Sequence, residues 1–415
     1  MRYQHGFVTK SLVGVFVIVG LIVAGVVLAQ QGREETSYTF DKAQQQSSEN
    51  TPDDIIDEEM PENNIIEDDL DEEATPIIIE ESVIEPIRLE TPEQVKAVYM
   101  TSWVAGTASI RERVLSLVED TEINALVIDI KDSTGKVAFR VDNELINSYD
   151  VTENRIPNIR EFIRSLNERG IYVIGRISVF QDPYLAERHP ELAVRTNTDG
   201  GVWKDHKGLS FLDVTNETVW NYITELALES YDVGFDEINF DYIRYPSDGD
   251  MSTIEYNLDQ EYTRADNVEK FFKHIDKEVR QKGIPTSADL FGMTTTHTKD
   301  LNIGQILEKT LPYFDYVAPM VYPSHYPKGW RGYAKPATEP YNIVHTAMKG
   351  GVERAEAMGY SGDRLRTWIQ DFNLGATYTA DMVRAQIQAS YDAGVDSWMV
   401  WDAANTYTRD AYLVE

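Results

Sequence analysis

The stretch GFDEINFDYIRYP, residues 234–246, alternates apolar and polar side chains and carries three acidic residues. Side chains alternate between the two faces of a β-strand, so Glu237, Asn239 and Asp241 share one face of a predicted strand over residues 237–242. The intervening apolar residues share the other face, which we expect to pack against helices. The polar face then points into the interior of a barrel, with Asp241 uppermost.

The same kind of strand recurs along the chain after residue 95, and most of these strands are followed by a segment with helical periodicity. The expected strands are 97–102, 125–130, 172–178, 237–242, 285–290, 316–322, 366–372 and 397–401. The expected helices include 110–117, 159–166, 218–230, 268–279 and 382–391. Alternation of buried strands and helices indicates a parallel sheet. Eight such units predict an α/β fold, a (β/α)₈ TIM barrel over residues 96–415.

The first 95 residues predict no globular domain. An apolar run at 12–29 follows Arg2 and Lys10, so we expect residues 1–32 to be a transmembrane signal anchor, or a cleaved signal peptide. Residues 33–95 predict a disordered acidic linker. We therefore expect an extracytoplasmic protein, held at the membrane by one helix or secreted. The net charge of -32 argues against a nucleic-acid partner.

Acidic residues stand at several strand ends, where TIM barrels keep their active sites. Cleavage of a glycosidic bond requires two carboxyl groups flanking it. Asp241 is the first candidate; Asp289, on the adjacent strand, is its preferred partner and Asp371 the second choice. The alternative for Asp241 is a structural ion pair with Arg244 or Arg176, and the other acids could be loop caps.

Aromatic and polar residues at the other strand ends suit a polyhydroxylated ligand, because the C–H face of a pyranose packs on aromatic rings. The predicted substrate-binding residues are Trp103, Asp129, Lys131, Arg176, Asn239, Arg244, Tyr322, Gln370 and Trp401. Cysteine is absent and the seven histidines lack metal-binding spacing, so we expect no metal and no cofactor.

The motif at 235–246 resembles the hallmark of a bacterial family known as putative glycosyl hydrolase domains, distant relatives of the α-amylase-like barrels. The resemblance extends to residues 127–132, 174–183, 318–326 and 368–372 and covers essentially 96–415. It implies a barrel and a nucleophile-like role for Asp241. In the amylase-like barrels the acid/base ends strand five, usually as Glu; here Asp289 stands there, one methylene shorter.

These observations predict a retaining glycoside hydrolase that cleaves an envelope or extracellular polysaccharide. The alternative is a surface-tethered carbohydrate-binding protein without turnover, because a fold alone does not determine function.

Overall fold

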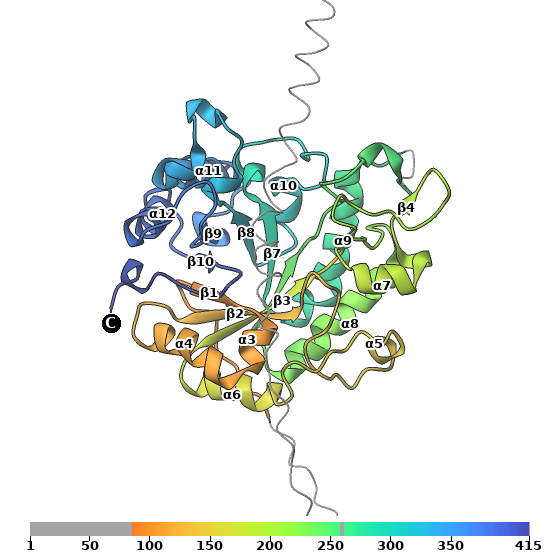
Figure 1. Cartoon of the computed structure of the whole chain (residues 1–415), viewed down its shortest axis with the longest axis horizontal. Coiled ribbons are helices and arrows are strands. Elements are labelled where there is room, and N and C mark those ends of the chain that lie inside the picture. Colours follow the sequence, from red (N-terminus) through yellow and green to blue (C-terminus); the bar gives the residue numbers. More distant parts are fainter. Residues whose placement is uncertain (1–84, 258–260, 415) are drawn as a thin grey trace, which may run out of the picture.

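A closed ring of eight parallel strands forms the centre of the protein (Figure 1), as the computed structural model of residues 85–257 and 261–414 describes it. The strands are β1 (Lys96–Met100), β2 (Ala125–Lys131), β3 (Tyr172–Ser178), β5 (Glu237–Asp241), β7 (Thr286–Phe291), β8 (Tyr316–Met320), β9 (Thr367–Gln370) and β10 (Trp398–Trp401). Each pairs in parallel with the next, and β10 pairs with β1 to close the ring. The predicted barrel is therefore confirmed.

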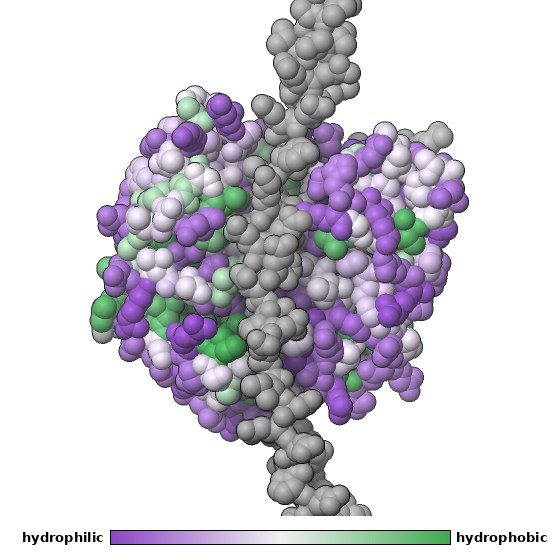
Figure 2. Space-filling view, in the orientation of Figure 1, coloured by the Kyte–Doolittle hydropathy of each residue, from purple (hydrophilic) through white to green (hydrophobic). Residues whose placement is uncertain are grey.

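Helices lie around the outside of this ring (Figure 1). They are α3 (Ser102–Gly106), α4 (Ala108–Glu119), α5 (Glu144–Ser148), α6 (Ile159–Glu168), α7 (Pro183–Arg188), α8 (Glu217–Val233), α9 (Arg264–Glu278), α10 (Leu307–Thr310), α11 (Pro340–Ala357) and α12 (Ala380–Asp392). The outward face of β5 is apolar, as expected: Ile238 and Phe240 are fully buried, and the Phe240 ring lies 5.9 Å from that of Phe314. Hydrophilic residues cover most of the visible surface of the barrel (Figure 2).

Two short strands outside the ring, β4 (Arg195–Thr196) and β6 (Ile254–Glu255), form an antiparallel pair. They belong to the loops that follow β3 and β5. Within residues 85–257 and 261–414, no helix is long and apolar enough to cross a membrane. The expected membrane helix at 12–29 lies outside the described residues, as does the linker up to residue 84.

The last part of the expected linker, residues 85–95, packs against the barrel. Arg88 donates hydrogen bonds to the Tyr231 and Phe235 carbonyls, at 2.6 and 3.1 Å, and its guanidinium lies 3.7 Å from the Tyr231 ring centroid. The Leu89 amide donates to Asp236, at 2.8 Å. Residues 88 and 89, within the predicted linker, therefore contact the chain at the end of α8 and just before β5.

The interior of the barrel contains a fully buried ion pair. Arg366 Nη1 lies 2.7 Å from Glu237 Oε1 and 2.9 Å from Oε2, and both side chains are 0% exposed. The Tyr172 hydroxyl donates to the same carboxylate at 3.1 Å. The burial of Glu237 on the inner face of β5 is what the strand alternation predicts. This pair lies at the start of β5, and Asn239 and Asp241 follow it toward the other end.

Four strands, β1, β5, β8 and β9, end earlier than predicted, and local structure explains the first two. The chain leaves β5 at Asp241 because Tyr242 adopts a left-handed conformation, with φ of 53°. β1 ends at Met100 because Thr101 caps α3, its hydroxyl accepting a hydrogen bond from the Val104 amide at 3.2 Å. As a result, Thr101 and Tyr242 lie outside the strands, where the chain leaves the sheet.

Removal of one partner of the buried pair should destabilise the fold strongly. Arg366→Met leaves the Glu237 carboxylate buried without its cation, so we expect the free energy of unfolding to fall by about 3–5 kcal/mol. The double variant Glu237→Gln with Arg366→Met should lose clearly less, since neither partner then leaves a charge behind. Urea unfolding followed by circular dichroism measures both changes.

The matched control is Arg164→Met, which breaks an exposed ion pair with Glu168 on α6. Exposed pairs contribute less than about 1 kcal/mol, so this variant should unfold nearly as the wild type does. Equal destabilisation by Arg366→Met and Arg164→Met would contradict the structural role assigned to the Glu237–Arg366 pair.

Candidate active site

Asp241 ends β5 on the inner face of the barrel, with its side chain 6% exposed. The next amide points back toward it: Tyr242 N donates to Asp241 Oδ1 at 2.6 Å. Tyr242 itself has a left-handed conformation, with φ of 53°. A bulky residue with positive φ is uncommon and costs conformational energy, and such residues gather at functional sites. The hydrogen bond from the Tyr242 amide holds one oxygen of the Asp241 carboxylate.

Arg176, on the neighbouring strand β3, binds two carboxylates at once. Its Nε and Nη2 atoms donate to Asp241 Oδ2 at 3.1 and 2.5 Å, and its Nη1 atom donates to Asp129 Oδ1 at 2.7 Å. Burial alone would lower the pKa of the Arg176 guanidinium, but Asp241 and then Asp129 raise it well above its usual value. Arg176 therefore stays cationic and pairs with Asp241.

Asp129 is held from its other side by Tyr99, whose hydroxyl donates to Asp129 Oδ2 at 2.5 Å. Burial raises the pKa of the Asp129 carboxyl, and Arg176 counteracts this effect. The chain Tyr99–Asp129–Arg176–Asp241 thus crosses β1, β2, β3 and β5. It fixes four side chains from neighbouring strands in one hydrogen-bonded network.

Asp289 stands beside Asp241 on the next strand, β7. The ladder pairs Asn239 with Ser287 and Phe240 with Ala288, and one residue further along both strands are Asp241 and Asp289. Asp289 Oδ1 accepts hydrogen bonds from Asn239 Nδ2 at 2.9 Å and from Trp368 Nε1 at 2.8 Å. Burial, and then the negative charge of Asp241, raise the pKa of Asp289 well above its usual value.

Aromatic side chains surround these carboxyl groups. The Trp401 ring stacks on the Tyr99 ring, with centroids 4.0 Å apart, and meets the Trp368 ring edge-on at 5.8 Å. The Arg176 guanidinium lies 5.0 Å from the Trp401 centroid. Burial, and then the charges of Asp289 and Asp241, raise the pKa of the Tyr322 hydroxyl.

Several predicted substrate-binding residues instead support the framework. Lys131 is fully buried in an ion pair with Asp182, at 2.8 Å. The side-chain oxygen of Gln370 accepts a hydrogen bond from the Ser324 amide at 3.2 Å. The backbone carbonyl of Gln370 accepts one from the Gln386 side chain at 2.7 Å. Asn239 is fully buried and donates to Asp289 and to Ser287, at 3.0 Å for the latter. These contacts engage the Lys131 ammonium and the polar groups of Gln370, whereas Asn239 Oδ1 has no hydrogen-bond partner among the described residues.

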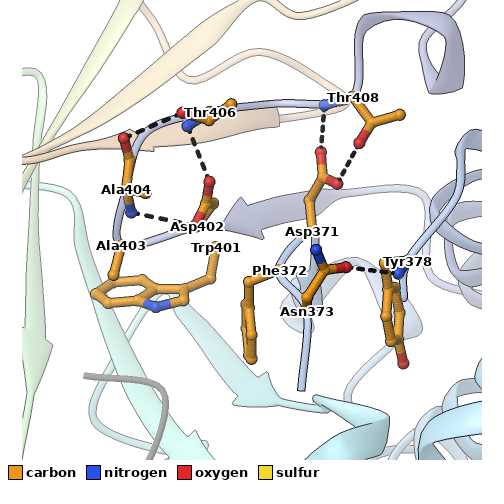
Figure 3. A pocket seen from close by; sticks show the side chains of 10 residues that line it. All are labelled: Asp371, Phe372, Asn373, Tyr378, Trp401, Asp402, Ala403, Ala404, Thr406 and Thr408. Atoms are coloured by element: carbon orange, nitrogen blue, oxygen red, sulfur yellow. Dashed lines mark hydrogen bonds between the residues drawn. The ribbon is translucent and has the colours of Figure 1, made fainter. Parts of the chain in front are cut away.

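Asp371, the second-choice partner, has a different environment from Asp289. Its carboxylate accepts hydrogen bonds from the amide and hydroxyl of Thr408, both at 2.7 Å (Figure 3). It also accepts one from the Tyr412 hydroxyl, at 3.1 Å. Burial raises the pKa of Asp371. Asp371 thus fastens the loop after β10, as a structural cap does.

The remaining two predicted residues lie toward the rim. Arg244 donates to the Tyr245 carbonyl at 3.0 Å, and its guanidinium lies 4.7 Å from the Phe291 ring centroid and 5.0 Å from that of Tyr242. Trp103, on α3, is 56% exposed and stacks against Arg155 at 4.7 Å. Arg244 therefore packs beside aromatic rings that lie at the ends of β5 and β7, whereas Trp103 is exposed on the surface.

Tyr99, Trp368 and Tyr242 were missed as site residues. Strand alternation could have identified Tyr99 and Trp368. Tyr99 shares a face of β1 with Ala97, and Trp368 shares a face of β9 with Gln370. Tyr242 carried no such signal, because the pattern placed it on the outward face of a continuing strand. Within residues 85–257 and 261–414, no group of three or more His, Asp or Glu is placed to hold a metal ion.

Known proteins with this architecture include sugar-cleaving enzymes. The glycoside hydrolase domain of PgaB (BpsB) from Bordetella bronchiseptica is 13% identical, with a TM-score of 0.58, covering 78% of this chain and 99% of that domain. A hypothetical protein from Ruminiclostridium thermocellum is 32% identical, with a TM-score of 0.42, covering 46% of this chain and 96% of that one. No curated protein matches the sequence.

The family described as "Putative glycosyl hydrolase domain" matches residues 97–407, which include every strand of the barrel except the first residue of β1. The match also includes both acids of the pair at the ends of β5 and β7. On this match, the chain belongs to that family of glycosyl hydrolase domains.

Proposed function

We propose that the chain is a retaining glycoside hydrolase, with Asp241 as the nucleophile and Asp289 as the general acid and base. One observation carries the proposal: two neighbouring inward carboxyls have opposite environments. Asp241 is paired with the Arg176 guanidinium, whereas burial and the charge of Asp241 raise the pKa of Asp289. An ionised carboxylate beside a protonated one is the arrangement that glycoside cleavage uses.

The spacing of the strands supports retention of configuration. Neighbouring strands in a sheet lie about 4.7–4.9 Å apart, and Asp241 and Asp289 follow paired residues on adjacent strands. Retaining enzymes hold their two carboxyls about 5–5.5 Å apart, while inverting enzymes need about 6.5–9.5 Å to admit a water molecule. Side chains at laterally paired positions match the shorter separation.

The reaction then runs in two steps. Asp289 gives its proton to the glycosidic oxygen while an Asp241 oxygen attacks the anomeric carbon, so the C–O bond to the leaving sugar breaks and a glycosyl ester forms. Asp289, now ionised, takes a proton from water, which attacks the same carbon and releases Asp241. Arg176 and the Tyr242 amide hold Asp241 in place, and Trp401 and Tyr322 offer faces for the sugar ring.

We further propose an envelope or extracellular polysaccharide as the substrate, reached from an extracytoplasmic position. The support is in the sequence: an apolar run behind basic residues, followed by an acidic segment before the barrel. A tethered enzyme of this kind would act on glycans within reach of that segment.

Asp241→Asn should abolish turnover. The amide cannot form the glycosyl ester, so we expect product formation to fall by about 10³-fold or more on whichever glycan the wild type cleaves. A glycan library incubated with both proteins, followed by mass spectrometry of the products, measures this. Proton NMR of the first-formed anomer tests retention on the same substrate.

The control is Asp371→Asn, the same substitution at the end of β9. Its carboxylate is engaged by Thr408 and Tyr412, so turnover should fall less than about tenfold. Equal product from wild type and Asp241→Asn would eliminate Asp241 as the nucleophile. Glycan binding by the wild type without any product would favour the alternative, a carbohydrate-binding protein.

Trp368→Phe should shift the pH dependence of kcat/KM toward alkaline pH. Activity requires protonated Asp289, so it falls as pH rises through the pKa of Asp289. The Trp368 N–H stabilises the charged form and lowers that pKa, although burial keeps it raised. Without this donor the pKa rises further, and the alkaline limb of the profile moves upward.

Trp398→Phe is the matched control, because Trp398 Nε1 donates to Tyr391 rather than to an acid, at 2.9 Å. Its alkaline limb should coincide with that of the wild type. A shift of the alkaline limb of Trp368→Phe to lower pH, or the same shift in both variants, would refute Asp289 as the general acid.

A further inference from the structure

A pocket of about 350 Å³ lies at the C-terminal ends of β9 and β10 (Figure 3). Its walls combine aromatic, acidic and small polar residues from the loops that follow these strands. The lining residues are Asp371, Phe372, Asn373, Tyr378, Trp401, Asp402, Ala403, Ala404, Thr406 and Thr408. None of the polar side chains in this set belongs to the proposed dyad, so the pocket has no role in the two bond-breaking steps.

The size and the aromatic walls of this pocket suit one sugar ring. Ligand sites span about 300–1,000 Å³, and this pocket falls at the small end of that range. Three of its lining residues, Phe372, Tyr378 and Trp401, offer aromatic surface, against which the C–H face of a pyranose packs. Asn373 and Thr406, both exposed, lie where ring hydroxyl groups would need polar partners.

The pocket shares walls with the catalytic centre. Trp401 lines the pocket and also lies 5.0 Å from the Arg176 guanidinium that holds Asp241. Phe372 lines the pocket and meets the Tyr322 ring edge-on at 5.8 Å. A glycan cleaved between Asp241 and Asp289 therefore has its adjoining part directed along Trp401 or Phe372 into this space.

The charge of the pocket restricts which sugar fits. Its lining set includes two carboxyl groups, Asp371 and Asp402, and no Lys, Arg or His. Burial raises the pKa of Asp402 to about 6, and Asp371 adds to that rise. Near neutral pH the Asp402 carboxyl thus repels an acidic sugar, whereas hydroxyl and amide groups can still donate to it.

We propose that this pocket is a subsite for one non-acidic pyranose unit of the substrate, adjoining the unit that is cleaved. The inference rests on the proposed glycosidase function for the identity of the neighbouring site. The proposal implies that the enzyme recognises at least two sugar units. The loops after β9 and β10 hold the second unit.

Ala404→Trp tests this proposal by filling the pocket without removing a contact. Ala404 is exposed and lines the pocket, so the indole should occupy the space and leave the dyad intact. The substrates are oligosaccharides of increasing length prepared from the cleaved glycan. For the wild type, kcat/KM should rise about tenfold when the oligosaccharide becomes long enough to enter the pocket. Ala404→Trp should lose that gain and cleave the shortest substrate as the wild type does.

Ala357→Trp, at the exposed C-terminal end of α11, is the matched control and should keep the gain with length. If Ala404→Trp keeps it too, the subsite is refuted while the hydrolase stands. If the wild type cleaves no glycan, the proposed function fails instead.

A second readout needs no turnover: saturation-transfer NMR with methyl β-glucopyranoside, N-acetylglucosamine and glucuronate. At least one of the two non-acidic probes should give a signal that Ala404→Trp reduces by half or more and Ala357→Trp leaves unchanged. Any signal from glucuronate should be the same in the wild type and in Ala404→Trp. Signals that are the same in wild type and both variants, or an Ala404-dependent signal for glucuronate alone, would overturn the subsite.

Discussion

The bridge that Arg176 makes between Asp129 and Asp241 is the interaction on which the proposed chemistry depends. One guanidinium pairs with two carboxylates from the strands on either side of it, at 2.7 and 2.5 Å. Asp289 lies next to the Asp241 carboxylate, whose Arg176 partner also pairs with Asp129. Because two adjacent buried carboxyls cannot both ionise at low cost, the proton is expected on the member without the guanidinium, which is Asp289.

The barrel makes this arrangement rigid. Asp241, Arg176 and Asp289 come from three consecutive strands in the ring, and their separations follow from the strand spacing rather than from loop conformation. Beneath them, the Glu237–Arg366 pair and the hydrogen bonds that Asn239 donates fill the interior with polar side chains, although Arg366 Nε and Nη2 and Asn239 Oδ1 have no hydrogen-bond partner among the described residues. The same strand, β5, therefore carries a structural acid at its start and the proposed nucleophile at its end.

Much of this was predictable from the sequence. Strand alternation placed Glu237, Asn239 and Asp241 on the inner face, and the order of strands made Asp289 the neighbour of Asp241. What the pattern could not supply was the pairing of side chains across the interior. Lys131 and Gln370 have the residue types of ligand contacts, but burial against Asp182 and Gln386 uses their polar groups. The turn at Tyr242 depends on backbone conformation, which alternation cannot reveal, and residues 85–95 have a linker's composition although they contact the barrel.

Infrared difference spectroscopy of wild type against Asp289→Asn, near neutral pH, tests the division of charge most directly. A protonated carboxyl has a C=O stretch that is well separated from the bands of a carboxylate. The wild type is predicted to show a protonated-carboxyl band that Asp289→Asn lacks. A difference spectrum with only carboxylate bands would mean that Asp289 is ionised, and would contradict its assignment as the general acid.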